Sequence, residues 1–217
     1  MIREIDIIET PTGRMSGDER RTQILKVAIK LFSQRGFSGT TTKEIARLAG
    51  VSEAMVFKHF ANKEELYSAI LDYKACDKHI QHRFDDLIKK TEEKDDFGVF
   101  YTMSLNALNY HSDDSNFMRL MLHSALEEHD LARMFFESFI TEMYSFLGDY
   151  IKQRQADGVF REIDPRIVVR AFMGMFVHHS LYNILWDKEQ KILNISNEEA
   201  ALQFTEILLN GIKIHKI

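Results

Sequence analysis

Residues 41–60 read TTKEIARLAGVSEAMVFKHF, and this stretch decides the fold. It predicts two short helices on either side of Gly50, because a tight turn between helices needs a left-handed backbone that glycine adopts without a steric penalty. Small Ala46 and Ala49 allow the helices to cross closely. We therefore expect a helix-turn-helix, whose second helix enters a DNA major groove, although a generic helical hairpin would share the pattern.

Helix-capping signals mark the remainder of the chain. Capping boxes, or their Asn variant, and other helix-end signals are predicted at Ser16/Glu19, Thr41/Glu44, Asn62/Glu65 and Ser196/Glu199, at Asp164-Pro165, and at Gly36 and Gly158. Between them, apolar residues recur every three or four positions, which is typical of amphipathic helices. The pattern predicts an all-α protein with helices at about 17–35, 42–49, 52–59, 63–90, 96–111, 115–128, 131–157, 165–186 and 197–214.

Charge is distributed unevenly along the chain. The formal net charge is −5 over 217 residues. Residues 14–63 carry ten Lys or Arg and four Asp or Glu, a balance of +6, so the rest of the chain totals −11. A basic N-terminal segment on an acidic body is typical of a polyanion-binding face, although ordinary surface scatter produces such runs as well.

The context of the helix-turn-helix extends the pattern. A helix ending in FSQRGF at 32–37 is followed by Thr41-Thr42, Ile45-Ala46, AGVS at 49–52, His59-Phe60 and NKEEL at 62–66. This run resembles the N-terminal domain of TetR-family regulators over about residues 17–70. The resemblance implies a three-helix helix-turn-helix DNA-binding domain followed by a larger helical ligand-binding and dimerisation domain. We expect a flexible extension at 1–15, the DNA-binding domain at 16–62, and the effector and dimerisation domain at 63–217.

Each polar residue of the motif has a physical role at DNA. Thr41, Thr42 and Ser52 lie at helix starts, where backbone amides and hydroxyls attract phosphate. Base readout and the recognition surface are assigned to Lys43, Glu53, Ala54, Met55, Phe57 and Lys58, while His59 and Lys63 match phosphate-contacting positions of the family. Three residues depart from the family pattern: Phe57 stands where Tyr is usual, Met55 where Thr is frequent, and Glu53 where a basic or polar residue is common. A carboxylate can accept from cytosine N4.

Large apolar side chains are dense on the later helices. They fill a helical core or line an adaptable pocket, and a Met/Phe-rich lining suits a small lipophilic or aromatic effector. The residues expected in the pocket walls are Phe100, Met103, Met121, Phe139, Phe172 and Phe176. The last two long helices carry more apolar surface than one buried face needs, which predicts a homodimer with Ala171, Gly174, Phe204 and Leu208 at the interface; closing a monomer core is the alternative.

Other classes of function find less support. No phosphate loop, nucleophile elbow or metal-binding histidine pair at i,i+4 is present, so we expect no enzyme, cofactor or metal. His178-His179 point about 100° apart on a helix and cannot easily share an ion. The lone Cys76 and the charged N-terminus predict a cytoplasmic protein, and polar residues interrupt the longest apolar stretch, so no membrane partner is expected.

Several alternatives stay open at this stage. The expected partner is double-stranded, palindromic operator DNA bound by a repressor, but the sequence does not separate a repressor from an activator. A DNA-binding protein that responds to no ligand is a further alternative. Translation starting at Met15 instead of Met1 would explain why a capping box follows directly.

Overall fold

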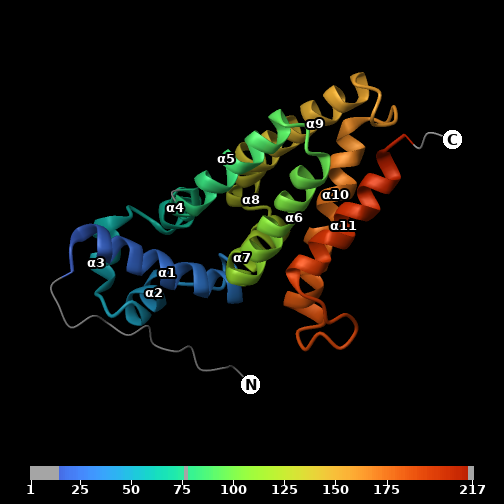
Figure 1. Ribbon diagram of the computed structural model, residues 1–217. Helices are drawn as coiled ribbons and strands as arrows, with labels where there is room; N and C mark the ends of the chain where they lie inside the picture. The colour runs from blue at the N-terminus through green and yellow to red at the C-terminus, as the bar shows by residue number, and fades with distance from the viewer. Residues whose placement is uncertain (1–14, 76–77, 215–217) are drawn as a thin grey trace. The chain divides into compact units, whose positions relative to one another are not determined.

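The computed structural model describes residues 15–75 and 78–214, and its regular structure is helical (Figure 1). The helices are α1 (Gly17–Arg35), α2 (Thr42–Leu48), α3 (Glu53–His59), α4 (Lys63–Ala75), α5 (Lys78–Glu92), α6 (Asp96–Asp113), α7 (Ser115–Leu126), α8 (Asp130–Phe135), α9 (Thr141–Ala156), α10 (Pro165–Leu181) and α11 (Asn197–Ile212). Two π-helical turns, η1 (Phe136–Ile140) and η2 (Tyr182–Trp186), adjoin α9 and α10. The described residues contain no strand, only an isolated bridge between Phe160 and Lys213. The predicted all-α class is confirmed.

Three of the predicted long helices are divided. The helix expected at 63–90 is two helices, and the one expected at 131–157 is α8, η1 and α9 in succession. Where η1 meets α9, the Thr141 hydroxyl donates to the Phe136 carbonyl at 3.0 Å, which satisfies an acceptor where the helical ladder changes. The helix expected at 165–186 likewise ends in η2. Apolar periodicity misses such turns because they shift the spacing by only one residue.

Most of the predicted helix caps are present. Reciprocal capping boxes join Ser16 with Glu19 and Thr41 with Glu44. Ser196 accepts from the Glu199 amide at 3.2 Å. Gly36 and Gly158 have φ of 69° and 70°, as predicted for left-handed residues at helix ends. At α4, the Asn62 side chain accepts from the Glu65 amide, but the Glu65 carboxylate reaches the Ala61 amide instead of Asn62.

The chain forms two compact packing units. Among the described residues, the first comprises 15–75 together with Asn116–Phe135, and the second comprises Lys78–Ser115 and 136–214. The predicted extension up to residue 14, and Cys76, lie outside the described residues. Because packing units and functional domains are different divisions, the domain limits drawn from the sequence stay predictions.

The core of the first unit lies among α1, α2, α3 and α4. Its fully buried side chains include Ile24, Phe32, Ile45, Phe60, Leu66 and Tyr67. Phe32 and Tyr67 meet edge to face at 4.7 Å between ring centroids. Segment 116–135 adds to this unit, because α8 packs on α4 and the Ser33 hydroxyl donates to the Asn116 side chain at 3.1 Å.

The second unit is built around α6, which packs against α5, α10 and α11. Its core contains Phe100, Leu147, Phe160, Val169, Phe172 and Ala200, all at 1% exposure or less. No helix in the described part of the chain is long and apolar enough to cross a membrane.

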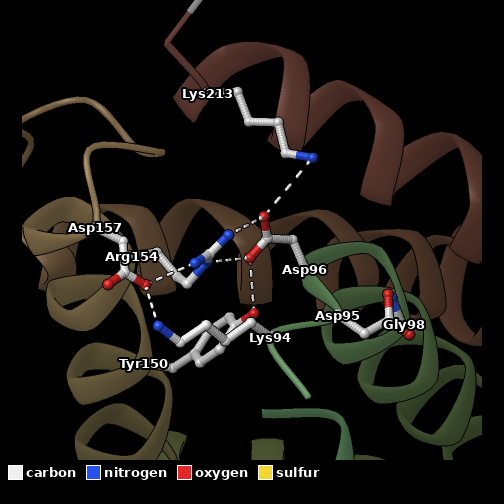
Figure 2. Close-up of polar contacts among 8 residues, drawn as sticks. All are labelled: Lys94, Asp95, Asp96, Gly98, Tyr150, Arg154, Asp157 and Lys213. Carbon is white, nitrogen blue, oxygen red and sulfur yellow. Dashed lines mark hydrogen bonds and ion pairs between the residues drawn. The ribbon is translucent and has the colours of Figure 1, made fainter. Parts of the chain in front are cut away.

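A buried ionic network fastens the start of α6 to α9. Asp96, 7% exposed, accepts from the Tyr150 hydroxyl and from Arg154 Nε, both at 2.7 Å, and from Arg154 Nη2 at 3.3 Å (Figure 2). Arg154 also donates to Asp157 at 2.7 Å, and Lys213 Nζ lies 3.8 Å from Asp96. The hydrogen bonds to Asp96 raise the pKa of Arg154, so the guanidinium stays charged. The network joins α6, α9 and the end of α11 at one place.

Candidate nucleic-acid interface

The helix-turn-helix predicted at residues 41–60 is present. α2 and α3 pack on each other, and α1 packs on α2 and α4. Gly50 has φ 64°, as its place in the turn predicted, and the Val51 amide donates to the Ala46 carbonyl at 3.0 Å. Ala46 and Ala49 are buried at 3% and 0% exposure, which lets α3 cross α2 closely.

α3 is anchored by one buried face. Val56 and Phe60 are 1% exposed, and the Arg21 guanidinium lies 4.8 Å from the centroid of the Phe60 ring. The Ser52 side chain caps α3 by accepting from the Met55 amide at 3.2 Å. Phe60 is therefore a core residue, and the opposite face of α3 is left outward.

The predicted DNA-contacting residues fall into two groups by exposure. The exposed ones are Thr41, Lys43, Ser52, Ala54, Phe57 and Lys58, and the half-buried ones are Thr42, Glu53, Met55, His59 and Lys63. Phe57 is 46% exposed, which is high for a large apolar side chain. Neither Lys43 nor Lys58 has an ion-pair partner in the described part of the chain. The surface of α3 thus offers an aromatic ring and an uncompensated cation.

Two contacts within this region were missed from the sequence. Arg35 Nη1 donates to Glu44 at 2.7 Å and ties the end of α1 to the first turn of α2. The Thr42 hydroxyl donates to Glu53 Oε1 at 2.6 Å and ties the first residue of α2 to the first residue of α3. The opposite charges of Arg35 and Glu44 offered a signal for the first contact. The sequence offers no comparable signal for the contact between Thr42 and Glu53, and both residues are predicted to contact DNA instead.

Lys63 has a more enclosed position than expected. Its ammonium lies 4.1 Å from the centroid of the Phe37 ring. Desolvation lowers the pKa of Lys63, and the nearby carboxylates of Glu64 and Glu127 oppose that shift. A cation on an aromatic face keeps its charge available on the other side, so contact with a phosphate remains compatible with this geometry.

Segment 116–135 contributes residues that sequence reasoning did not assign to this unit. Glu127 accepts from the Phe37 amide at 3.0 Å. The His129 ring lies 4.3 Å from the Phe37 ring and 4.4 Å from the Tyr67 ring, centroid to centroid. A Cβ at Gly36 would collide with Glu127 Oε1, so the carboxylate that accepts from the Phe37 amide would have to move. These contacts fix the residues that link α1 to α2.

The residues predicted to line an effector pocket do not all gather in one unit. Phe100, Met103, Phe172 and Phe176 lie in the core of the second unit. Phe172 packs edge to face with Phe100 at 5.1 Å and with Phe176 at 5.3 Å. Phe139 is half-buried in η1, and Met121 is half-buried on α7 in the first unit. The pocket remains a prediction.

The residues predicted at a dimer interface differ in exposure. Ala171 and Gly174 are exposed on α10, Phe204 is half-buried, and Leu208 is only 6% exposed within the core. The neighbouring Ile207 takes the outward position instead, at 60% exposure. Leu208 is thus placed to stabilise the unit itself, because the helical period turns it inward.

The adjacent histidines point in different directions, as expected from helix geometry. The His178 ring is exposed and lies 4.9 Å from the Tyr182 ring, while His179 is buried and bonds to the Asn183 side chain at 3.1 Å. Burial lowers the pKa of His179. Within the described residues, no three His, Cys, Asp or Glu side chains gather to hold a metal ion.

This geometry defines a class of protein, namely a helix-turn-helix DNA-binding protein with a helical second unit. Residues 24–70 match the family model "Bacterial regulatory proteins, tetR family", and residues 102–210, about half of the chain, match "AefR-like transcriptional repressor, C-terminal domain". The chain belongs to the TetR family and is a DNA-binding transcriptional regulator; the resemblance inferred from the sequence is confirmed.

Individual relatives agree with this assignment. The transcriptional repressor KstR2 of Rhodococcus jostii is 25% identical over 93% of this chain and 96% of its own length. The transcriptional regulator AcrR of Shigella flexneri is 44% identical, but the match spans only 26% of either chain. High similarity is therefore concentrated in one short segment of the chain.

Solved structures show the same fold. The structure of NalD, a secondary repressor of the MexAB-OprM multidrug efflux pump in Pseudomonas aeruginosa, aligns with a TM-score of 0.67 at 20% identity, over 91% of this chain and 98% of that one. AibR in complex with isovaleryl coenzyme A and operator DNA aligns with a TM-score of 0.64 at 23% identity, over 88% and 98%. At these identities the likeness concerns the fold.

Proposed function

We propose that this protein is a ligand-responsive repressor that binds a palindromic operator as a homodimer and is released by a small apolar or aromatic effector. The observation that carries the proposal is the outward face of α3, where Ala54, Phe57 and Lys58 are exposed beside buried Val56. That face belongs to the basic segment 14–63. Because bacterial DNA lies in the cytoplasm, the protein would act there.

Phosphate and base contacts are divided by chemistry. Thr41, Ser52, His59 and Lys63 supply hydroxyl, imidazole and ammonium groups suited to the DNA backbone, which sets affinity and salt dependence. The recognition surface on α3, with Lys43 of α2, supplies the base contacts. Phe57 can offer its exposed ring to a thymine methyl group.

The homodimer is supported by an exposed face on α10 and α11, two helices that pack side by side. Ile167, at 62% exposure, and the exposed Ala171 and Gly174 follow one another at the spacing of a single helical face. A side chain at Gly174 or at Gly211 would meet no atom within 4 Å. An exposed apolar face with such small residues suits the close approach of the same helices from a second copy.

An effector agrees with the AefR-like match over residues 102–210 and with the ligand-binding domain that the family resemblance implies. AibR was solved together with isovaleryl coenzyme A, so a structural relative holds an acyl coenzyme A. The dense aromatic core around Phe100, Phe172 and Phe176 favours an apolar or aromatic ligand for this chain. Such a ligand regulates only if it binds the DNA-free and DNA-bound states with different affinity.

The test of DNA binding starts with selection of genomic fragments on the purified protein, followed by fluorescence anisotropy on the selected duplex. We expect Lys58→Ala to weaken binding, because it removes an unpaired cation from α3. Lys188→Ala removes an exposed lysine of the second unit and serves as the matched control. Equal affinities for the two variants would contradict the proposed interface.

The homodimer is tested by light scattering at micromolar concentration. Gly174→Glu should give a monomer that no longer binds the operator, while Gln153→Glu, which adds the same charge at an exposed position of α9, should remain dimeric. A monomeric wild type, or a Gly174→Glu protein that dimerises fully, would refute the interface.

The effector is tested by screening apolar and aromatic compounds for those that raise the melting temperature and also release the operator. Phe172→Leu should weaken the response to such a compound, whereas Phe97→Leu, at a residue 40% exposed, should not.

In vitro transcription from the selected operator distinguishes a repressor from an activator. An activator is a specific alternative because a relative, FasR of Mycolicibacterium smegmatis, is named as an activator and is 44% identical over 59 residues.

A further inference from the structure

The contact between Thr42 and Glu53 joins the first residues of the two short helices of the DNA-binding motif. The Thr42 hydroxyl donates to Glu53 Oε1 at 2.6 Å, and both side chains are half-buried. A hydroxyl bonded to a carboxylate at this distance is a charge-assisted hydrogen bond, which is stronger than a bond between neutral groups. The residues are eleven positions apart, so the bond is a tertiary contact between α2 and α3.

The chemistry of this bond limits what either residue does at DNA. A threonine hydroxyl has a single hydrogen, and here that hydrogen goes to Glu53. While the bond is intact, the Thr42 side chain has no hydrogen to donate to a phosphate. Glu53, for its part, has one oxygen held toward α2.

We propose that Glu53 is a positioning residue, whose carboxylate holds α3 on α2 through Thr42 and so sets the orientation of the base-facing side chains of α3. This inference rests on the proposed function, because it concerns sequence choice at operator DNA. It assigns Glu53 an action through Thr42 in place of the direct base contact expected from the sequence.

The position of the bond explains why it controls orientation. The turn is already attached to α2 where the Val51 amide donates to the Ala46 carbonyl at 3.0 Å. Thr42 lies four residues before Ala46, about 6 Å along the helix axis. Two attachments separated along α2, together with the buried Val56 and Phe60, define the angle of α3.

The frame to which α3 is held is itself fixed. The first turn of α2 is tied to α1 by the bond from Arg35 to Glu44 at 2.7 Å, and Glu44 also completes the capping box with Thr41. Thr42 therefore belongs to a rigid start of α2. A series of side-chain contacts runs from α1 through α2 to the first residue of α3.

Direct base reading by Glu53 predicts a different outcome. A carboxylate that accepts from one cytosine affects preference at one base pair and does not depend on the Thr42 hydroxyl. A positioning carboxylate affects the whole recognition surface, and its effect disappears when that hydroxyl is absent. The two roles therefore separate in a double-mutant cycle.

The experiment measures the ratio of affinities for the selected operator and for a random duplex of equal length, together with binding-site selection. Thr42→Val removes the hydroxyl at nearly constant shape, and Glu53→Ala removes the carboxylate. Each should lower the ratio about tenfold, the size expected for losing one charge-assisted hydrogen bond. The double variant should be no worse than either single one, and Thr42→Ser should behave as wild type.

Two further variants separate the bond from the charge. Glu53→Gln keeps an acceptor for Thr42 and should retain most of the discrimination, while its binding to random DNA increases because a negative charge is lost. Glu64→Gln, at an exposed position of α4, is the control: it should increase binding to random DNA and leave the selected motif unchanged. The melting temperatures of all variants verify that they are folded.

Selection distinguishes the outcomes. The inference requires Thr42→Val and Glu53→Ala to weaken preference at several base pairs in the same way. A Glu53→Ala protein altered at one base pair, with Thr42→Val unchanged, would overturn it in favour of direct reading, and so would effects that multiply in the double variant. A wild-type protein that selects no sequence would refute the proposed function itself, and this inference with it.

Discussion

Replacing Asp96 tests whether the buried ionic network of the second unit sets its stability. Asp96→Ala leaves the buried Tyr150 hydroxyl and the Arg154 guanidinium without their shared acceptor. Breaking a buried ion pair by removing one partner costs about 3–5 kcal/mol. Because Asp157 still accepts from Arg154 at 2.7 Å, we expect the lower end, about 3 kcal/mol.

The conservative variant refines that magnitude. Asp96→Asn keeps the size and one acceptor oxygen but removes the charge, so it loses the charge-assisted part of the interaction, about 2 kcal/mol. In a chain of this length each kcal/mol lowers the melting temperature by roughly 2–4 °C. The expected decreases are therefore about 6–12 °C for Asp96→Ala and about 4–8 °C for Asp96→Asn.

Urea unfolding followed by circular dichroism measures the change directly. Asp149→Asn is the matched control, because it removes an aspartate that is 74% exposed and whose partner Lys152 is 67% exposed. Exposed pairs contribute little to stability, so the control should unfold with the wild type. If Asp96→Asn also unfolds at the same urea concentration as the wild type, the network does not contribute the stability that its geometry implies.

Three further predictions concern single residues. Lys63→Ala should weaken binding to operator and random DNA alike and reduce the salt dependence by about one phosphate, as titrations at several salt concentrations would reveal; an unchanged slope contradicts the phosphate contact. Gly36→Ala should destabilise the fold by about 2 kcal/mol, since φ is 69° and the new methyl displaces Glu127; Gly158→Ala, with φ 70° and open space around it, should lose only the backbone part, about 1 kcal/mol, in the same urea titration. Burial lowers the pKa of His111 to about 4, below its unfolded value near 6.5, so its contribution is present above pH 6.5 and is lost as the pH falls toward 4; His111→Gln should flatten that dependence in unfolding curves measured across this range.

Local signals in the sequence were sufficient for several of the helix ends. The capping boxes at Ser16 and Thr41 and the left-handed glycines at 36, 50 and 158 were predicted because each depends on residues within one turn of itself. The helix-turn-helix followed for the same reason. Its small residues and turn glycine all lie within twenty residues.

Long-range contacts were beyond that reasoning. Glu127 packs against Gly36 and bonds to the Phe37 amide across ninety positions of sequence, and the Tyr150 hydroxyl reaches Asp96 across fifty-four. Neither Glu127 nor Asp96 carries a local pattern, because in a sequence each looks the same as a surface carboxylate of ordinary spacing. The bond between Thr42 and Glu53 escapes the sequence for a different reason. The helix-turn-helix pattern predicts a phosphate as the partner of Thr42 and a base as the partner of Glu53, so a bond between the two is not expected.

The large apolar residues illustrate what a pattern of burial can and cannot specify. The density of large apolar side chains on the later helices placed Phe100, Phe172 and Phe176 in a helical core or a pocket wall, and all three are buried. Such a pattern does not distinguish a side chain that fills the core from one that lines a cavity, because both need an apolar surface. It also cannot assign a helix to a packing unit, and so it grouped Met121 with residues of the second unit although α7 packs in the first. Leu208 and Ile207 are neighbours in the sequence, but Leu208 is buried and Ile207 is exposed. Which residues of a helix can reach an interface therefore depends on the rotation of the helix about its axis, and packing determines that rotation.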